Sequence, residues 1–213
     1  MRAPVSEPSL RKALCDAGRV LYERGLIGPT DGNLSARVGD RRLLCTPSGA
    51  HKGMLREGDI VLLDLDGKVI RGGKPSSELK LHLALYQQKP ALACVVHAHP
   101  PSAVGLTVAG FGLDPPVVPE ILFAMGRVPT VPYASPTTSD VPDAVAVVVA
   151  AGCEAFMLAR HGSVVLCDDP MTGVMRTEII EHTAKITLAA RAAGSAVPLS
   201  EDEIRRLLTL AGR

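Results

Sequence analysis

Hydrophobic and polar residues follow one another in short blocks along the chain, and the period of each block predicts an element of secondary structure. Apolar residues recur every three to four positions, as in amphipathic helices, over 9–24, 79–87 and 172–193. Runs of strand length cover 34–38, 42–46, 60–65, 68–71, 92–99, 155–159 and 163–167. Asp66-Gly67 predicts a hairpin between two of these strands. Helices that surround many short strands predict a layered α/β fold, in one domain over residues 1–213.

The remaining segments carry weaker or more local signals. A helix is expected over 102–109, and the capping box formed by Ser200 and Glu203 opens a last helix near the C-terminus. The Pro-rich region 114–142 predicts short extended pieces. The apolar run 143–151 lacks the periodicity that would decide between helix and strand.

Composition and charge narrow the class of protein. The chain is 46% hydrophobic and 21% charged, as globular proteins are, and its formal charge of +1 provides no field that attracts nucleic acid or an anionic membrane. Its five widely spaced cysteines support neither a disulfide framework nor a zinc ribbon and fit a reducing cytoplasm. The N-terminus lacks the apolar core of a signal peptide, and the longest apolar run, 144–151, is too short for a membrane span. We therefore expect a cytoplasmic location.

Six histidines equal the six aromatic residues in number, which suggests that some histidines serve chemistry. His97 and His99 end an apolar strand, and residues two apart on a strand point to the same face, so both rings can reach one ion. The alternative is two ordinary polar residues at a strand end. His161 lies between two apolar runs, where a histidine is either structural or a third ligand. Three converging histidines would leave an open coordination position, as in catalytic zinc sites.

A second set of residues predicts an anion pocket. In Lys74-Pro75-Ser76-Ser77-Glu78, hydroxyl groups precede a predicted helix, whose first N–H groups lack internal partners and favour negative charge. The alternative is a helix cap with an acidic first turn. The turns Gly32-Asn33 and 46–49 add further donors. His82 and His182 are expected to be packing or surface residues, and His51 lies in a loop without an assigned role.

Taken in chain order, these motifs resemble those of the class II aldolase/adducin-head family, over residues 9–193. The motifs are Gly32-Asn33-Leu34-Ser35, Thr46-Pro47-Ser48-Gly49, Pro75-Ser76-Ser77-Glu78, His97-Ala98-His99-Pro100 and His161-Gly162. The resemblance implies a three-layer α/β/α sandwich of the aldolase/epimerase type, with a largely antiparallel central sheet. It also implies a homotetramer whose active sites lie at subunit boundaries.

By the same resemblance, a divalent metal would be held by His97, His99 and His161, with Glu78 as a carboxylate that ligates the resting metal and acts as acid/base. The metal would be Zn²⁺, with Mn²⁺, Co²⁺ or Fe²⁺ as other candidates. The substrate phosphate would be bound by Asn33, Ser48, Gly49, Ser76 and Ser77.

The activity expected from this site belongs to carbohydrate metabolism. It is that of a metal-dependent aldehyde-lyase, an aldolase that cleaves a small phosphorylated ketose to dihydroxyacetone phosphate and an aldehyde through a zinc-stabilised enediolate. A phosphorylated sugar or sugar acid is thus the expected partner.

One position departs from the family pattern. Where fuculose-phosphate aldolases place a tyrosine that helps protonate the aldehyde, this chain has Phe123, and the segment 199–213 contains no tyrosine. Tyr133 is a conjectural substitute, although packing is its simpler role. The alternatives are a decarboxylase, dehydratase or epimerase on the same scaffold, a non-haem iron oxygenase, and a non-catalytic adducin-like module. The epimerases prefer aspartate where Glu78 stands.

Overall fold

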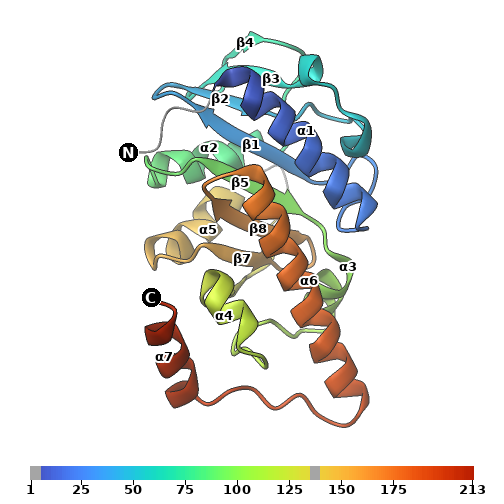
Figure 1. Cartoon of the computed structure of the whole chain (residues 1–213), viewed down its shortest axis with the longest axis vertical. Helices are drawn as coiled ribbons and strands as arrows, with labels where there is room; N and C mark the ends of the chain where they lie inside the picture. The colour runs from blue at the N-terminus through green and yellow to red at the C-terminus, as the bar shows by residue number, and fades with distance from the viewer. Residues whose placement is uncertain (1–5, 135–139) are drawn as a thin grey trace.

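Eight strands form one sheet at the centre of the computed structural model, which describes residues 6–134 and 140–213 (Figure 1). They are β1 (Asn33–Val38), β2 (Arg42–Cys45), β3 (Val61–Asp64), β4 (Val69–Arg71), β5 (Cys94–Ala98), β6 (Thr130–Val131), β7 (Ala155–Leu158) and β8 (Gly162–Cys167). Their order across the sheet is β4-β3-β2-β1-β5-β8-β7-β6. All neighbours pair antiparallel except β6 and β7, which pair parallel. The expected largely antiparallel sheet is thus confirmed.

Helices cover both faces of this sheet (Figure 1). One face carries α1 (Glu7–Glu23), α3 (Pro101–Val108), α4 (Glu120–Met125), α6 (Pro170–Ala192) and α7 (Glu201–Leu210), and the other carries α2 (Leu79–Gln88) and α5 (Asp140–Ala150). In the central strand β5, Val96 packs into the first layer and Val95 into the second. This alternation creates two cores and confirms the three-layer α/β/α sandwich. Across the described ranges, every helix is too short or too polar to cross a bilayer.

Local sequence signals fix the helix ends. The Ser6 hydroxyl accepts a hydrogen bond from the Ser9 amide at the start of α1, and the Asp169 carboxylate does the same from Thr172 for α6. The capping box predicted before α7 is present, because Ser200 and Glu203 each accept from the other's backbone N–H. Each cap satisfies amide groups that have no partner within the helix.

The structure corrects one prediction from the sequence and decides one segment that the sequence left open. Within the Pro-rich region 114–142, residues Glu120–Met125 form helix α4 rather than an extended piece. Pro119 caps this helix, because proline is tolerated where the first amides need no intrahelical acceptor. The undecided apolar run is helix α5, in which Val145 and Val149 are buried, whereas Val147 is exposed.

Chain segments from both halves of the sequence meet at one edge of the sheet. Strand β1 begins at Asn33, which pairs with His97 near the end of β5. The β7–β8 turn brings His161 to the same edge, because β8 is the other neighbour of β5. The isolated bridge between Pro47 and Pro75 joins the loop after β2 to the segment before α2. The predicted motifs therefore lie side by side.

Candidate metal centre

Four side chains converge at this edge. His97 lies on β5, His99 follows it, His161 lies in the β7–β8 turn, and Glu78 immediately precedes α2. One nitrogen or oxygen atom from each lies within 4.8 Å of those of the others. His97 is fully buried, and the three other side chains are largely buried, with Glu78 11% exposed. The structure thus brings together the four residues that the family resemblance assigned to a metal.

The distances within this cluster suit a small cation. The Nε2 atom of His97 lies 3.0 Å from that of His99 and 3.4 Å from that of His161. The carboxylate oxygens of Glu78 each lie 3.2 Å from a histidine Nε2 atom, Oε2 from His97 and Oε1 from His161. Tetrahedral ligands with bonds near 2.1 Å are separated by about 3.4 Å, so the donor set fits Zn²⁺ or a similar divalent ion.

A hydrogen bond at Nδ1 of His97 determines that Nε2 is the ring nitrogen that can bind a metal. Its Nδ1 atom lies 2.8 Å from the carbonyl oxygen of Ser163, to which it donates a hydrogen bond. Because Nδ1 carries the proton, Nε2 presents its lone pair to the other histidines. A backbone partner of this kind is typical of histidines that bind metals.

Two glycines allow the close approach of these segments. A Cβ atom on Gly162 would lie 2.4 Å from the Ala98 carbonyl oxygen and 2.9 Å from Cε1 of His97. Gly32 has φ of 65°, and a Cβ atom there would lie 2.8 Å from the carbonyl oxygen of His97. The glycines of the Gly32-Asn33 and His161-Gly162 motifs are therefore required by the packing around His97.

Burial and mutual contact set the protonation of this cluster. Burial raises the pKa of Glu78, but the hydrogen bonds and charges of His161 and His97 outweigh it and hold that pKa far below its ordinary range. Burial, with the charges of His97 and His161, lowers the pKa of His99 to about 3. An ionised carboxylate beside a neutral His99 is the state in which both groups bind a cation.

A cavity of about 230 Å³ opens beside the cluster. Its wall includes Glu78, His99 and His161, together with every residue that the family resemblance assigned to phosphate: Asn33, Ser48, Gly49, Ser76 and Ser77. Two backbone hydrogen bonds hold the loops together, from the Ser48 amide to Lys74 and from the Ser76 amide to Thr46. The Ser76 hydroxyl does not cap α2 but accepts a 3.2 Å hydrogen bond from the Glu78 amide. The binding of phosphate by these residues stays a prediction.

Lys52, which the sequence reasoning did not single out, also lines this cavity. It is 1% exposed, and its ammonium group donates hydrogen bonds to the carbonyl oxygens of Thr30 and Ala50, at 3.0 and 2.8 Å. Burial lowers its pKa. Across the described part of the chain, no carboxylate lies within ion-pairing distance of it. The charges of Cys45 and Asp31 act in the opposite direction on this pKa, and Asp31 lines the same cavity. A buried ammonium group without a directly paired carboxylate favours an anionic ligand.

The other histidines lie outside the metal cluster. His82 is fully buried and hydrogen-bonded through both ring nitrogens, so the expectation of a packing or surface residue was incomplete. Burial, chiefly, lowers its pKa to about 3. His182 is exposed on α6, as one of its two alternatives predicted, and His51 packs edge-on against the Tyr22 ring.

The two aromatic residues considered for the aldehyde end lie away from this wall. Phe123 is 48% exposed on α4, and Tyr133 is 59% exposed rather than packed. Neither residue lines the cavity that the described residues form beside the cluster. This chain alone therefore offers no tyrosine hydroxyl there.

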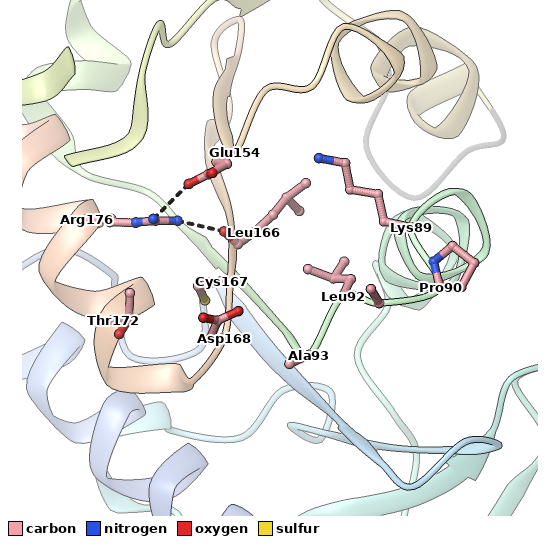
Figure 2. A pocket seen from close by; sticks show the side chains of 11 residues that line it. Lys89, Pro90, Leu92, Ala93, Glu154, Leu166, Cys167, Asp168, Thr172 and Arg176 are labelled. Atoms are coloured by element: carbon pink, nitrogen blue, oxygen red, sulfur yellow. Dashed lines mark hydrogen bonds and ion pairs between the residues drawn. The ribbon is translucent and has the colours of Figure 1, made fainter. Parts of the chain in front are cut away.

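A larger cavity, of about 400 Å³, lies at the opposite ends of β5 and β8 (Figure 2). Its charged side chains are already engaged, because Arg176 donates to the carbonyl oxygen of Leu166 and pairs with Glu154 at 2.8 Å. It is not the candidate site, because it lacks histidines among the described residues that line it, whereas the smaller cavity adjoins three.

Comparison with known proteins places these features in context. The sequence profile described as the class II aldolase and adducin N-terminal domain matches residues 12–188. The chain is 34% identical to a 3-oxo-tetronate 4-phosphate decarboxylase of Haemophilus influenzae, over 83% of this chain and 85% of that protein.

Solved structures agree with this relationship. The crystal structure of YgbL from Escherichia coli superimposes with a TM-score of 0.86 at 32% identity and covers 95% of this chain and 99% of YgbL. An L-fuculose 1-phosphate aldolase superimposes with a TM-score of 0.88 at 27% identity, over the full length of both chains.

Proposed function

The chain belongs to the class II aldolase and adducin N-terminal domain family, and from this premise we propose that it is a metal-dependent decarboxylase of a small phosphorylated 3-oxo sugar acid. The observation that carries the proposal is the histidine and glutamate cluster, which adjoins a cavity lined by serine hydroxyl groups and by Lys52. A relative that is similar over most of the chain carries the name of a 3-oxo-tetronate 4-phosphate decarboxylase. This relationship favours the decarboxylase alternative over the aldolase that the motifs first suggested.

A feature of this chain points in the same direction. Aldol cleavage removes a proton from the hydroxyl group that becomes the aldehyde oxygen, and the reverse addition returns that proton. A tyrosine is expected to carry it, but this chain has Phe123 at that position. Decarboxylation releases CO₂ instead, so the reaction has no aldehyde oxygen to protonate. The missing hydroxyl is thus no obstacle to a decarboxylase.

The residues at the two ends of the cavity would have different roles in the reaction. The Ser48, Ser76 and Ser77 loops and the Lys52 ammonium would bind the phosphate group. His97, His99 and His161 would hold a divalent cation, which when bound supplies a Lewis acid that polarises the substrate carbonyl. These contacts orient the bond to the carboxylate group toward the cluster.

Glu78 is placed to manage the proton. When the carbon–carbon bond breaks, CO₂ leaves and the bonding electrons move toward the neighbouring carbonyl oxygen. The carbon that loses CO₂ then takes one proton from a water molecule, and the hydroxide that remains is neutralised by the solvent. The ionised Glu78 would orient that water by accepting a hydrogen bond from it. The amide of Asn33 donates a 2.7 Å hydrogen bond to Oε2 of Glu78 and thus orients the carboxylate.

The proposal extends to properties that the family resemblance implies. We expect Zn²⁺ as the native metal, one catalytic domain over residues 1–213, a cytoplasmic location and a homotetramer with sites at subunit boundaries. Size-exclusion chromatography with light scattering tests the assembly, and metal analysis of purified protein tests the ion.

Incubation with 3-oxo-tetronate 4-phosphate and measurement of released CO₂ test the reaction. We expect CO₂ release that a chelator abolishes and a divalent metal restores. A parallel incubation with dihydroxyacetone phosphate and a panel of aldehydes tests aldol addition. Aldol adducts without CO₂ release would refute the decarboxylase in favour of the aldolase.

A further inference from the structure

A chain of hydrogen bonds runs from the metal cluster into the core. It begins at Glu78, whose Oε2 atom accepts from Nδ2 of Asn33 at 2.7 Å. The Oδ1 atom of Asn33 contacts Nε2 of His82, and Nδ1 of His82 lies 2.6 Å from the Ser35 hydroxyl oxygen. The Ser35 hydroxyl is in turn 3.0 Å from that of Tyr86. The four residues beyond Glu78 are all buried.

Two periodicities place these groups opposite one another. Glu78, His82 and Tyr86 are four residues apart, so they lie along one face of α2 and the residue that precedes it. Asn33 and Ser35 are two residues apart on β1, so they point to the same side of the sheet. The helix face and the strand face therefore interlock, which explains why His82 does not pack as an apolar residue.

The direction of each hydrogen bond follows from its ends. An ionised carboxylate only accepts, so Asn33 turns its NH₂ group toward Glu78 and its carbonyl oxygen toward His82. His82 must then carry its proton on Nε2, and its Nδ1 lone pair accepts from Ser35. Ser35 accepts in turn from the protonated Tyr86 hydroxyl. Each donor in the chain thus has one acceptor.

The ring of His82 leaves Asn33 one orientation. Without a donor at Oδ1, the amide of Asn33 would gain freedom to rotate, and its hold on Oε2 of Glu78 would weaken. That oxygen is the one that lies 3.2 Å from Nε2 of His97. An amide does not pass protons onward as a hydroxyl does, so the chain holds geometry and does not conduct protons.

We propose that His82 is a positioning residue, which acts through Asn33 to keep the Glu78 carboxylate aimed at the histidine cluster. The inference deepens the proposed function, because Glu78 is the group that orients the proton-donating water there. Groups that hydrogen-bond a metal ligand, as Asn33 does to Glu78, typically contribute 10–100-fold to activity or metal affinity, and His82 acts through that group.

The variant His82→Leu removes the donor, and His82→Gln restores one at the Nε2 position. We expect His82→Leu to lower kcat by roughly 10–100-fold with little change in KM, and His82→Gln to recover part of the loss. The visible spectrum of Co²⁺-loaded protein should shift in His82→Leu, because Glu78 leaves its position beside the ion. This spectrum needs no substrate, so it tests the inference even if the proposed reaction proves wrong.

A control separates positioning from a general loss of stability. Thr177 on α6 is fully buried and donates a 2.8 Å hydrogen bond to the carbonyl oxygen of Gly173, away from the site. Thr177→Ala leaves a cavity in the core and should lower the Tm without altering the Co²⁺ spectrum or kcat. If His82→Leu also lowers only the Tm, or raises KM at constant kcat, His82 has no positioning role.

Discussion

Gly162→Ala adds one methyl group where β8 leaves the His161 turn, and the surrounding atoms have no space for it. The new Cβ atom would lie 2.4 Å from the Ala98 carbonyl oxygen, 2.7 Å from Cδ2 of His99 and 2.9 Å from Cε1 of His97. To reach ordinary contact, the Ala98 oxygen would have to move by about 1 Å, and both rings would have to follow. Metal ligands tolerate about 0.5 Å of displacement before geometry is lost.

The expected magnitudes follow from this overlap. Overpacking of a buried site costs about 1–3 kcal/mol of the free energy of unfolding, and a chain of this size loses roughly 2–4 °C in Tm for each kcal/mol. Because the displaced atoms are ligand rings or their direct neighbours, we expect metal affinity to fall at least tenfold. A tenfold loss of affinity corresponds to about 1.4 kcal/mol, so the loss of binding free energy should at least be comparable with the loss of stability.

The assay is a titration of chelator-treated protein with Zn²⁺, combined with thermal unfolding with and without the ion. Gly105→Ala is the matched control, because Gly105 lies inside α3 with no atom within 4 Å of the added Cβ. It should stabilise the protein by about 0.5–1 kcal/mol, as alanine does in helices, and leave Zn²⁺ binding unchanged. Unchanged Zn²⁺ affinity in Gly162→Ala would refute the geometric argument for this centre.

Three further substitutions or conditions test the rest of the account. Lys52→Met removes the buried cation of the cavity and should raise the KM for a phosphorylated substrate by roughly tenfold or more, at nearly constant kcat; equal KM values in steady-state kinetics would exclude phosphate binding by Lys52. Because burial lowers the pKa of His82 from 6.5 to about 3, the unfolded state binds the extra proton, so this residue should cost about 2 kcal/mol of stability between pH 7 and pH 5. In urea unfolding of chelator-treated protein, the free energy of unfolding of His82→Leu should fall less between pH 7 and pH 5 than that of the unsubstituted protein. An identical fall in both proteins would contradict this assignment to His82. Ser200→Ala removes the side-chain cap of α7 and should lower the free energy of unfolding by about 1 kcal/mol in urea unfolding. The activity should stay unchanged, and a loss of activity would contradict a purely stabilising role of α7.

Local patterns were sufficient for most of the fold. The strand period placed His97 and His99 on one side, and the capping box located the start of α7. Helix α5 could not be decided from its run of alanine and valine, because only the sheet beneath it distinguishes buried Val145 from exposed Val147. Whether this run forms a helix or a strand therefore depends on its tertiary contacts and not on its own sequence pattern.

The candidate site, too, could be predicted only in part from the sequence. The order of the motifs was enough to gather Glu78 and the histidines, whereas Lys52 and His82 were missed because their roles depend on burial and on partners far along the chain. A lysine three residues after the 46–49 turn, and a histidine four residues after Glu78, were the available signals. The position of His82 has meaning only when α2 is packed against β1, and that of Lys52 only when its ammonium group reaches the Thr30 carbonyl oxygen.

The order of the strands also places the metal centre between two parts of the sheet that come from different parts of the chain. Strands β1 to β4 come from the first part of the chain and β5 to β8 from the second, and the two groups meet only where β1 pairs with β5. Glu78 belongs to the first part, whereas all three histidines belong to the second. An ion that binds all four residues therefore links the part of the chain that ends with α2 to the part that begins with β5. The backbone connects these two parts only through the loop between α2 and β5. Occupancy of the centre reports assembly of the whole sheet, and a chain cut in that loop would recover the four-ligand site only when its fragments rejoin.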